Sequence, residues 1–481
     1  MLDQKLKEYA TTDIYPFHMP GHKRRELDTW SPYRTDITEI DGFDNLHEAR
    51  EILLEAQQQA AELYGSKECY YLINGSTCGI LAAISAAVPK HGKILVARNC
   101  HKAVYNGILL RELDAVYAYP VPTKAGIQGQ ITAEQIEGLL EEHPDIAAVL
   151  ITSPTYDGVV SDVKAIAEVV HAKNLPLIVD AAHGAHLGFC KEFPENPISQ
   201  DADVVIESVH KTLPAFTQTA LLHVCSNRVS SEKIKKYLGI YETSSPSYIL
   251  MAGIDRCIHY MKERGAHDLE LLAKNLAEFY ERAKRLKNMK VLQKQDLSPE
   301  EAYDFDFSKI LIFSKNQKVS GADMHRSLLE KYHLQMEMVS GQYVLALCSV
   351  MDTPEGFRRL IEALEEMDES ELFAEGIFPV SCVAYDSQED TQGFLSIYRP
   401  KRQLLPLYRT EELETETVLL QQAVGKAAGC YLYLYPPGIP LIVPGEEITE
   451  ELLEDIAKCR RAGLTVEGFA AENRICIVNF S

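Results

Sequence analysis

Two segments of the chain place reactive side chains directly after apolar, β-branched runs. The run that ends at Val179 leads into Asp180, and the run that ends at Ile206 leads into the segment that contains Lys211. A carboxylate at the end of a buried strand needs a partner or a cavity, since burial of an unpaired charge is costly. Asp180 also fits a helix N-cap, and Lys211 alone fits a surface loop. Their spacing, about one helix-and-strand unit, predicts that they follow neighbouring strands and face one crevice.

Two further segments offer hydroxyl groups and an aromatic ring. Asn74-Gly75-Ser76-Thr77-Cys78-Gly79 follows a short strand predicted over 69–73 and begins an apolar helix. Free backbone N–H groups at a helix start, at the positive end of its dipole, are typical of an anion site. A plain capped helix has the same pattern. His101 follows a strand predicted over 93–97, and it is either a cap or core histidine or a flat ring that stacks on a planar ligand.

Together the four segments contain the groups that pyridoxal phosphate chemistry requires. A lysine must form the Schiff base, and a carboxylate must keep the pyridine nitrogen protonated so that the ring accepts electrons. Lys211 and Asp180 are the candidates for these tasks. His101 offers the stacking ring, and the hydroxyls of Ser76 and Thr77 offer a phosphate site. The sequence therefore predicts a pyridoxal phosphate enzyme.

These residues need a sheet that brings the strand ends together. Apolar runs at 93–97, 147–152, 176–180 and 203–207 alternate with helical patterns at 102–112, 133–142 and 161–173. The alternation predicts an α/β fold with a mainly parallel sheet that helices cover on both faces. Ligands bind at the carboxyl ends of such strands. An amphipathic helix is predicted before these elements, over 46–64, and Gly65 is predicted to end it.

Changes of pattern divide the chain into an N-terminal segment (1–45), a large cofactor-binding domain (46–265) and two smaller domains. The first of these, over 266–375, is predicted to be α/β. Its expected helices are 265–288, 321–332 and 355–369, with strands at 309–314 and 343–347. The second, over 376–481, begins where prolines become frequent, and we expect a small α+β domain there.

Composition and charge exclude several classes of protein. Hydrophobic residues are 46% of the 481-residue chain and charged residues 25%, as in soluble globular proteins. The net charge of −22 disfavours nucleic acid and anionic membranes as partners. We expect no membrane span and no signal peptide, because no run of 18 apolar residues occurs and residues 1–13 mix charged and apolar types.

The cysteines and histidines show no metal or disulfide pattern. The eleven cysteines contain no CxxC pair, and the pairs His18/His22 and His183/His186 lack the glutamate of a zinc helix. We therefore expect reduced cysteines, no metal site and a cytoplasmic protein.

Four motifs resemble the bacterial ornithine/lysine/arginine decarboxylase family. They are His18-Met19-Pro20-Gly21-His22-Lys23, Asn74-Gly75-Ser76-Thr77, Ser208-Val209-His210-Lys211-Thr212-Leu213-Pro214-Ala215 and Pro436-Pro437-Gly438-Ile439-Pro440. The resemblance covers nearly the whole chain and implies the aspartate aminotransferase fold (fold type I of pyridoxal phosphate enzymes). Because the first motif begins at residue 18, the chain resembles the short branch, which lacks an N-terminal receiver-like domain.

The resemblance also implies roles for individual residues. Lys211 would be the Schiff-base lysine, Asp180 would bind the pyridine nitrogen, and His101 and Ala182 would contact the two faces of the ring. The residues implied for the phosphate are Ser76, Thr77, Ser208 and His210. The segment 243–248, with Ser245, resembles one that reaches the phosphate of the neighbouring subunit, which implies a homodimer or a higher homo-oligomer. The sequence departs from many relatives at Cys78-Gly79-Ile80, and at His183, where the large enzymes tend to have Trp.

The predicted reaction is decarboxylation of a dibasic amino acid, with arginine favoured over lysine and then ornithine because the short branch is linked to polyamine synthesis. Another reaction on the same fold, such as transamination, is the alternative, and a non-catalytic cofactor-binding regulator is the third possibility. Lys211 or His183 could return the proton to Cα. Glu337 and the pair Glu446-Glu447 are acids that could bind the distal cation, although a solvated surface position is the simpler interpretation of each.

Overall fold

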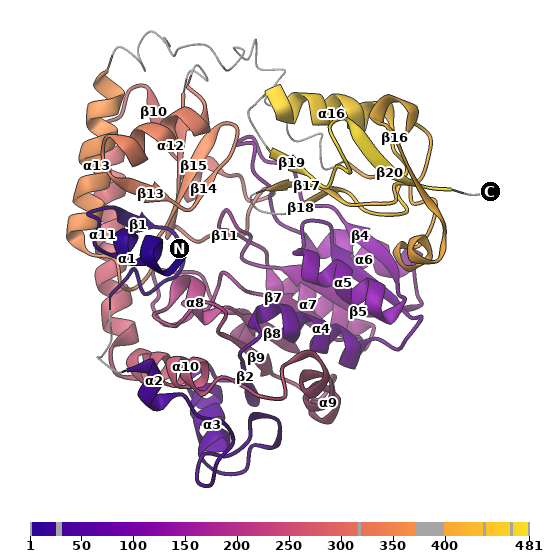
Figure 1. Ribbon diagram of the computed structural model, residues 1–481, viewed down its shortest axis with the longest axis horizontal. Coiled ribbons are helices and arrows are strands. Elements are labelled where there is room, and N and C mark those ends of the chain that lie inside the picture. Colours follow the sequence, from indigo (N-terminus) through magenta and orange to yellow (C-terminus); the bar gives the residue numbers. More distant parts are fainter. Residues whose placement is uncertain are drawn as a thin grey trace.

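A seven-stranded sheet forms the centre of the protein (Figure 1). The computed structural model describes residues 2–25, 31–315, 319–370, 399–435, 439–461 and 465–479. The strand order in the sheet is β2-β9-β8-β7-β5-β3-β4. These strands are β2 (Glu68–Leu72), β3 (Lys93–Ala97), β4 (Asp114–Ala118), β5 (Ile146–Thr152), β7 (Leu177–Asp180), β8 (Val204–Glu207) and β9 (Ala220–Val224).

The sheet is mainly parallel, as the sequence predicts. Each neighbouring pair from β4 through β3, β5 and β7 to β8 is parallel, and β9 runs antiparallel to both β8 and β2. In β3, Ile94 and Val96 pack on one face, while Leu95 and Ala97 pack on the other. Such alternation with both faces apolar is typical of a sheet covered on both sides.

Helices cover each face of this sheet. The apolar core on the Ile94 face includes α4 (Gly75–Ala87), α5 (Lys102–Arg111) and α9 (Ser231–Tyr241). The core on the Leu95 face includes α6 (Ala133–Glu142) and α7 (Val163–Ala172). Strands β2, β3, β5, β7 and β8 and helices α5, α6 and α7 agree with the ranges predicted for them to within two residues, so the α/β prediction is confirmed. No range was predicted for β4, β9 or α9.

A four-stranded antiparallel sheet lies beside the central one, with the order β10-β12-β15-β14. Its strands are β10 (Met289–Val291), β12 (Lys309–Ser314), β14 (Met338–Val339) and β15 (Tyr343–Leu347), and its helices are α11 (Ala266–Ala283), α12 (Gly321–Glu330) and α13 (Pro354–Glu369). The N-terminal strand β1 (Tyr15–Phe17) pairs in parallel with β13 (Leu334–Met336). The N-terminal segment therefore packs against this part of the chain.

The C-terminal part has a separate apolar core. It contains β16 (Thr415–Leu419) paired with β20 (Arg474–Val478), the sheet β18-β17-β19 (Ile439–Ile442, Leu432–Tyr435 and Thr465–Glu467), and α16 (Glu450–Arg461). The boundary expected near residue 376 and the residues 436–438 of the proline motif lie outside the described residues. The four-part domain division stays a proposal.

Two predicted helices differ in their limits. The helix expected over 46–64 is a 3₁₀ turn at Leu46–Glu48 followed by α3 (Ile52–Tyr64). Asp44 causes the delay, because its carboxylate accepts hydrogen bonds from the N–H groups of Arg50 and Glu51 at 2.9 and 2.8 Å. The helix expected over 265–288 begins earlier, because α10 (Tyr248–Tyr260) continues through a π-helical turn, Met261–Gly265, into α11.

Further short elements are α1 (Leu2–Ala10), α2 (Pro32–Thr35), α8 (Val209–Thr212), β6 (Val159–Val160) and β11 (Asp304–Phe305). Strands β6 and β11 pair with each other. Among the helices that the structure describes, none combines the length and the apolar character needed to cross a membrane.

Candidate active site

Lys211 lies in the short helix α8, directly beyond the end of β8. Its Nζ atom is 2.9 Å from Nε2 of His183. Burial lowers the pKa of Lys211 to about 8, although the charges of Asp180 and Glu337 act in the opposite direction. A lysine with this pKa is neutral far more often at physiological pH than an ordinary lysine, which is what a nucleophilic amine requires.

Asp180 ends β7, the strand next to β8, and its Cα partner on β8 is Ile206. The side chain is 2% exposed, and its Oδ1 accepts a hydrogen bond from the N–H of Ala182 at 3.1 Å. The pKa of Asp180 is raised, because the effect of burial exceeds the opposite effect of the Lys211 charge. The prediction that Asp180 and Lys211 follow neighbouring strands is confirmed.

His183 is buried between Lys211 and the ring of Tyr156. The ring centroids of Tyr156 and His183 are 4.6 Å apart. Burial, followed by the charges of Lys211 and Lys309, lowers the pKa of His183 well below its usual value, so the ring is neutral. Its Nδ1 has no hydrogen-bond partner in the described part of the chain. His183 therefore has one nitrogen for Lys211 and one that remains free.

The hydroxyl groups expected to bind an anion meet at the start of α4. Ser208 Oγ donates a hydrogen bond to Ser76 Oγ at 3.1 Å, and Gly75, with φ +76°, makes the turn that leads into the helix. Thr77 is exposed on the first turn. Nδ1 of His210 is 2.8 Å from the carbonyl oxygen of Thr219, and burial lowers the pKa of this ring to about 4.

His101 is the N-cap of α5. Its Nδ1 accepts a hydrogen bond from the N–H of Ala103 at 3.2 Å, so the cap interpretation is confirmed. The residue is exposed. Desolvation, followed by the charge of Lys211, lowers its pKa to about 4. The cap bond leaves the faces of this neutral ring free for a planar ligand.

Glu337 lies between β13 and β14, and its carboxylate is held on both oxygens. Oε2 accepts a hydrogen bond from the N–H of Met19 at 2.7 Å, and Oε1 accepts one from the hydroxyl of Tyr156. Tyr156 was not predicted as a site residue. It belongs to Ser153-Pro154-Thr155-Tyr156-Asp157-Gly158, which follows β5, so the same strand-end argument would have found it.

A second group of polar residues that the sequence did not reveal lies buried near His183. Lys309 Nζ donates to Asp306 Oδ2 at 3.1 Å, and His186 Nε2 is 3.3 Å from Asp306 Oδ1. Lys309 and Asp306 are fully buried, and the Lys309 charge contributes to the lowered pKa of Lys211. A lysine at the start of an apolar strand carries no signal of burial, because the carboxylate that compensates it is recognised only in three dimensions.

Two residues that the sequence analysis considered for the site, Ser245 and Glu446, make other contacts. Ser245 is exposed before α10, where its N–H donates to Thr243 Oγ1 at 3.2 Å. Glu446 is 2% exposed and forms an ion pair with Arg98 at 3.0 Å, so its interpretation as a solvated surface acid is wrong. The reason is that the C-terminal part covers the end of β3, where Arg98 requires a buried partner.

The sequence matches two parts of one known family. The major domain of Orn/Lys/Arg decarboxylase matches residues 2–309, and the C-terminal domain of the same family matches residues 400–473. The chain belongs to the Orn/Lys/Arg decarboxylase family. It is therefore a decarboxylase of the α/β fold that the sequence predicts, and this assignment favours decarboxylation over the aminotransferase and regulator alternatives.

Individual relatives agree with this assignment. The chain is 30% identical to an arginine decarboxylase of Halalkalibacterium halodurans, over 96% of this chain and 93% of the relative. It is 29% identical to an arginine decarboxylase of Bacillus subtilis, over 96% and 94%. The crystal structure of a Francisella novicida lysine decarboxylase has a TM-score of 0.78 at 19% identity and covers 99% of this chain and 81% of that one.

Decarboxylases of this family use pyridoxal phosphate, and the geometry of the site fits that cofactor. A lysine of lowered pKa, a buried carboxylate on the next strand, and two hydroxyls at the start of a 13-residue helix are the donor set that an aldehyde, a pyridine nitrogen and a phosphate require. The predicted cofactor is thus supported by the arrangement of this chain's own residues.

Proposed function

We propose that this decarboxylase acts on arginine and releases agmatine. The observation that carries the proposal is the carboxylate of Glu337, whose charge raises the pKa of Lys211 and which is fixed by Met19 and Tyr156. It is a fixed carboxylate close enough to Lys211 for its charge to act on that lysine, and in this proposal it binds the substrate's distal cation. A carboxylate has about four lone-pair sites, so two remain for a planar guanidinium.

Each residue of the site has a task in this proposal. Lys211 holds the cofactor, Asp180 binds the pyridine nitrogen, and His101 and Ala182 contact the ring. The phosphate is bound by the start of α4, with the side chains of Ser76, Thr77, Ser208 and His210. The bound cofactor accepts the electron pair left when CO₂ departs.

In this proposal His183, with Lys211, returns the proton to Cα of the product. Its Nε2 is within hydrogen-bond distance of Lys211, and its neutral ring can receive a proton from the ammonium form of that lysine. Tyr156 packs against it and at the same time holds Glu337. The ring that governs the proton and the carboxylate that binds the distal cation are therefore fixed by the same side chain.

A substrate panel tests the proposal. Purified enzyme with cofactor is given arginine, lysine or ornithine, and CO₂ and the product mass are measured. We expect kcat/KM for arginine to exceed the others. Glu337→Gln should raise the KM for arginine at least tenfold, about 1.4 kcal/mol, while the exposed Glu263→Gln leaves it unchanged. A tenfold preference for lysine or ornithine would show that arginine is the wrong substrate.

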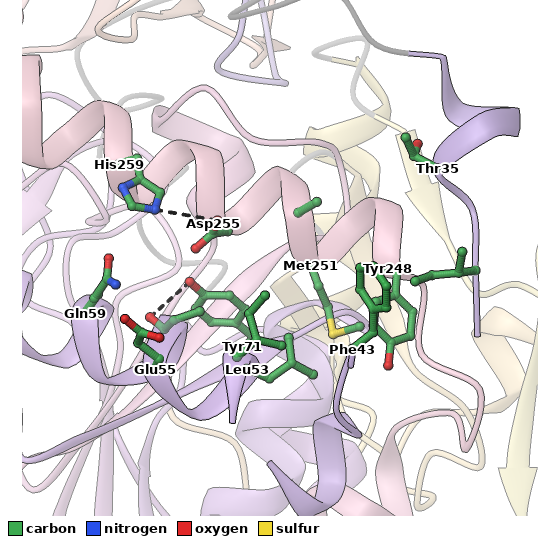
Figure 2. Close-up of a pocket in the computed structure, with 14 residues that line it drawn as sticks. Thr35, Phe43, Leu53, Glu55, Gln59, Tyr71, Tyr248, Met251, Asp255 and His259 are labelled. Atoms are coloured by element: carbon green, nitrogen blue, oxygen red, sulfur yellow. Dashed lines mark hydrogen bonds and ion pairs between the residues drawn. The ribbon is translucent and has the colours of Figure 1, made fainter. Parts of the chain in front are cut away.

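We further propose that the enzyme is a homodimer with shared active sites. A groove of about 440 Å³ lies between α3 and α10 and is lined by Phe43, Leu53, Met251 and Tyr248, which Figure 2 labels. Phe43 and Ile52 are 43% and 51% exposed, which is unusual for large apolar side chains that face water together. Ser245 is also exposed, three residues before Tyr248, so the segment resembling a subunit-crossing one adjoins this groove.

Mixing of two inactive variants tests the shared site. Lys211→Ala and Ser245→Asp each disable a site, but a mixed dimer would contain one site with both native residues if Ser245 serves the partner. We expect activity to return on mixing. A mixture of Lys211→Ala with Asp180→Ala is the control, because both residues serve their own subunit and no activity should return. A fully active monomer of Phe43→Asp would contradict the dimer.

We infer a cytoplasmic location as well. The ten cysteines that the structure describes are all free, and most of them are buried, which agrees with a reducing compartment. Fractionation of the producing cells, followed by an assay of each fraction, tests this inference.

A further inference from the structure

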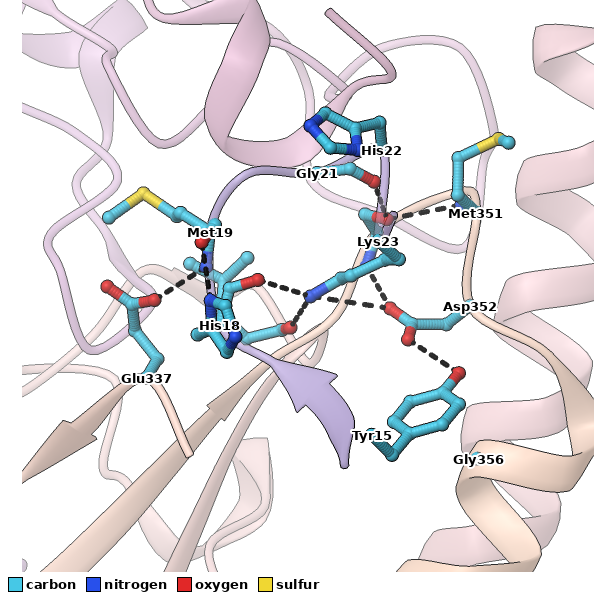
Figure 3. A network of polar contacts seen from close by, with 12 residues as sticks. Tyr15, His18, Met19, Gly21, His22, Lys23, Glu337, Met351, Asp352 and Gly356 are labelled. Carbon is cyan, nitrogen blue, oxygen red and sulfur yellow. Dashed lines mark hydrogen bonds and ion pairs between the residues drawn. The ribbon is translucent and has the colours of Figure 1, made fainter. Parts of the chain in front are cut away.

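Lys23 is a buried lysine in the segment Met19–Lys23, which we call the strap (Figure 3). Its side chain is almost inaccessible, at 5% exposed. The Nζ atom donates hydrogen bonds to the carbonyl oxygens of His18 at 3.0 Å and of Leu347 at 2.6 Å, and it lies 3.8 Å from Asp352 Oδ2. Each donor of the ammonium thus faces an acceptor, and the decarboxylation steps described above do not use this residue.

The partner carboxylate is itself fixed. Asp352 accepts hydrogen bonds from the hydroxyl of Tyr15 at 2.9 Å and from the N–H of Ser349 at 2.7 Å. The ring of Tyr15 fills the space beside Gly356, where a Cβ atom would come within 2.1 Å of it. Because a buried ammonium that loses a partner is left unpaired, this arrangement resists displacement of Lys23.

The strap also touches the helix that bears Lys211. The N–H of Gly21 donates to the carbonyl oxygen of His210 at 2.7 Å. A Cβ atom at Gly21 would lie 2.7 Å from the carbonyl oxygen of Leu213 and 2.8 Å from its nitrogen. Only a glycine allows the two backbones to approach this closely, so the position of the strap determines the position of α8.

Two residues before Gly21, the strap contacts the other side of the site. The N–H of Met19 donates to Oε2 of Glu337 at 2.7 Å. A stretch of five residues, held at one end by Lys23, therefore contacts both the lysine-bearing helix and the carboxylate of Glu337, as Figure 3 shows for Met19, Glu337 and Lys23.

We propose that Lys23 is a positioning residue that sets the separation of Lys211 and Glu337 and so selects the length of the dibasic substrate. This inference rests on the proposed role of Glu337 in binding the distal cation. With the strap fixed, a substrate must span a set length from its α-amine to its distal cation. If the strap is loosened, Glu337 can move toward the distal cation of a shorter substrate. The preference for arginine over lysine then falls.

Substrate discrimination in Lys23→Met tests the proposal. We expect the ratio of kcat/KM for arginine to that for lysine to fall at least tenfold, mainly through a higher KM for arginine. A purely structural loss would reduce kcat/KM for both substrates by the same factor and leave the ratio unchanged. Asp368→Asn is the matched control, because this buried carboxylate at the opposite end of α13 accepts three backbone hydrogen bonds and does not touch the strap. It should lower the melting temperature and leave the ratio unchanged.

Milder variants keep the test decisive if Lys23→Met does not fold. Tyr15→Phe removes one hydrogen bond from Asp352, and Gly21→Ala pushes the strap away from α8. Each should lower the ratio at least threefold. An unchanged ratio in both, with the variants folded and cofactor-loaded, would overturn the proposal.

A binding measurement separates this inference from the proposed substrate. The affinities of the cofactor-loaded wild type and Tyr15→Phe for agmatine and cadaverine are measured by calorimetry, without turnover. If the wild type fails to decarboxylate arginine, the proposed function is wrong, while the ratio of the two amine affinities still reports on the strap. A ratio that is equal in wild type and variant would contradict the role of Lys23.

Discussion

The amine of Lys211 lies 2.9 Å from Nε2 of His183, at the carboxyl edge of the central sheet. The pKa of each group is lowered, chiefly by burial, so the lysine is neutral more often than an ordinary lysine and the histidine is neutral. A proton on this pair resides mainly on Lys211, because its pKa of about 8 is higher than that of His183, and the neutral histidine accepts the hydrogen bond. Such a pair can give a proton to carbon and recover it, which is the last step of a decarboxylation.

Replacement of Lys211 by Ala should abolish turnover and the visible absorbance of the bound cofactor. No other described lysine lies at the end of β8 beside Asp180, so the covalent anchor is lost. Absorbance spectra and a CO₂ assay of the purified variant check this. The exposed Lys274→Ala should behave as wild type. Cofactor absorbance retained in Lys211→Ala would mean that another lysine, such as the buried Lys309, is the anchor.

Loading of the cofactor should depend on pH through Lys211. The amine must be neutral to attack an aldehyde, and its pKa is lowered to about 8. At pH 7 about a tenth of the molecules then have a neutral amine, against fewer than about one in a thousand at the ordinary lysine value. The initial rate of loading should rise from pH 6 to 9 with a midpoint near 8, as followed by stopped-flow absorbance. A flat profile, or a midpoint above 10, would disagree with the lowered pKa.

Replacement of His183 by Gln should retain the cofactor and lower kcat about 100-fold, the usual scale of a lost general acid. In deuterated water the wild type should place one deuterium at Cα in a single configuration, and the variant should lose that preference. Mass spectrometry and NMR of the product measure both. The exposed His267→Gln serves as control. A kcat within threefold of wild type would assign the proton to Lys211 instead.

Much of this site could be predicted because parallel strands end at one edge of a sheet. The runs that end at Asp180 and before Lys211 have a strand's length and apolar character, and their order along the chain placed them side by side. His101 was harder to interpret, because the same residue caps α5 and leaves its ring faces free, and no pattern separates those roles.

What the sequence did not reveal are contacts between residues far apart in the chain. Lys23 contacts Asp352, Met19 contacts Glu337, and Arg98 contacts Glu446. The sequence around each of these residues gives no sign of the partner. Burial of a charged residue depends on which other segment covers it. Local periodicity holds no information on that, so the strap and the C-terminal contact appear only in the structure.

The pair Arg98 and Glu446 leads to a prediction about stability. Their side chains are 3% and 2% exposed, and Arg98 donates to both oxygens of Glu446, at 3.3 and 3.0 Å, as well as to the carbonyl oxygen of Pro440 at 3.0 Å. Arg98→Met should lower the free energy of unfolding by about 3–5 kcal/mol, because a carboxylate is left buried without its cation.

The double variant Arg98→Met/Glu446→Leu should lose less than the single one, about 1–3 kcal/mol. It contains no unpaired charge, but the N–H of Val443, which donates to Glu446 at 2.8 Å, is left without its acceptor. Urea unfolding followed by fluorescence measures both. The exposed pair Arg358–Glu355 is the control, and Glu355→Gln should leave the free energy of unfolding almost unchanged. A double variant no more stable than Arg98→Met would show that lost packing, and not the unpaired charge, accounts for the cost. Because Arg98 is three residues before His101, we also expect the single variant to bind the cofactor more weakly, and the double variant to recover part of that binding.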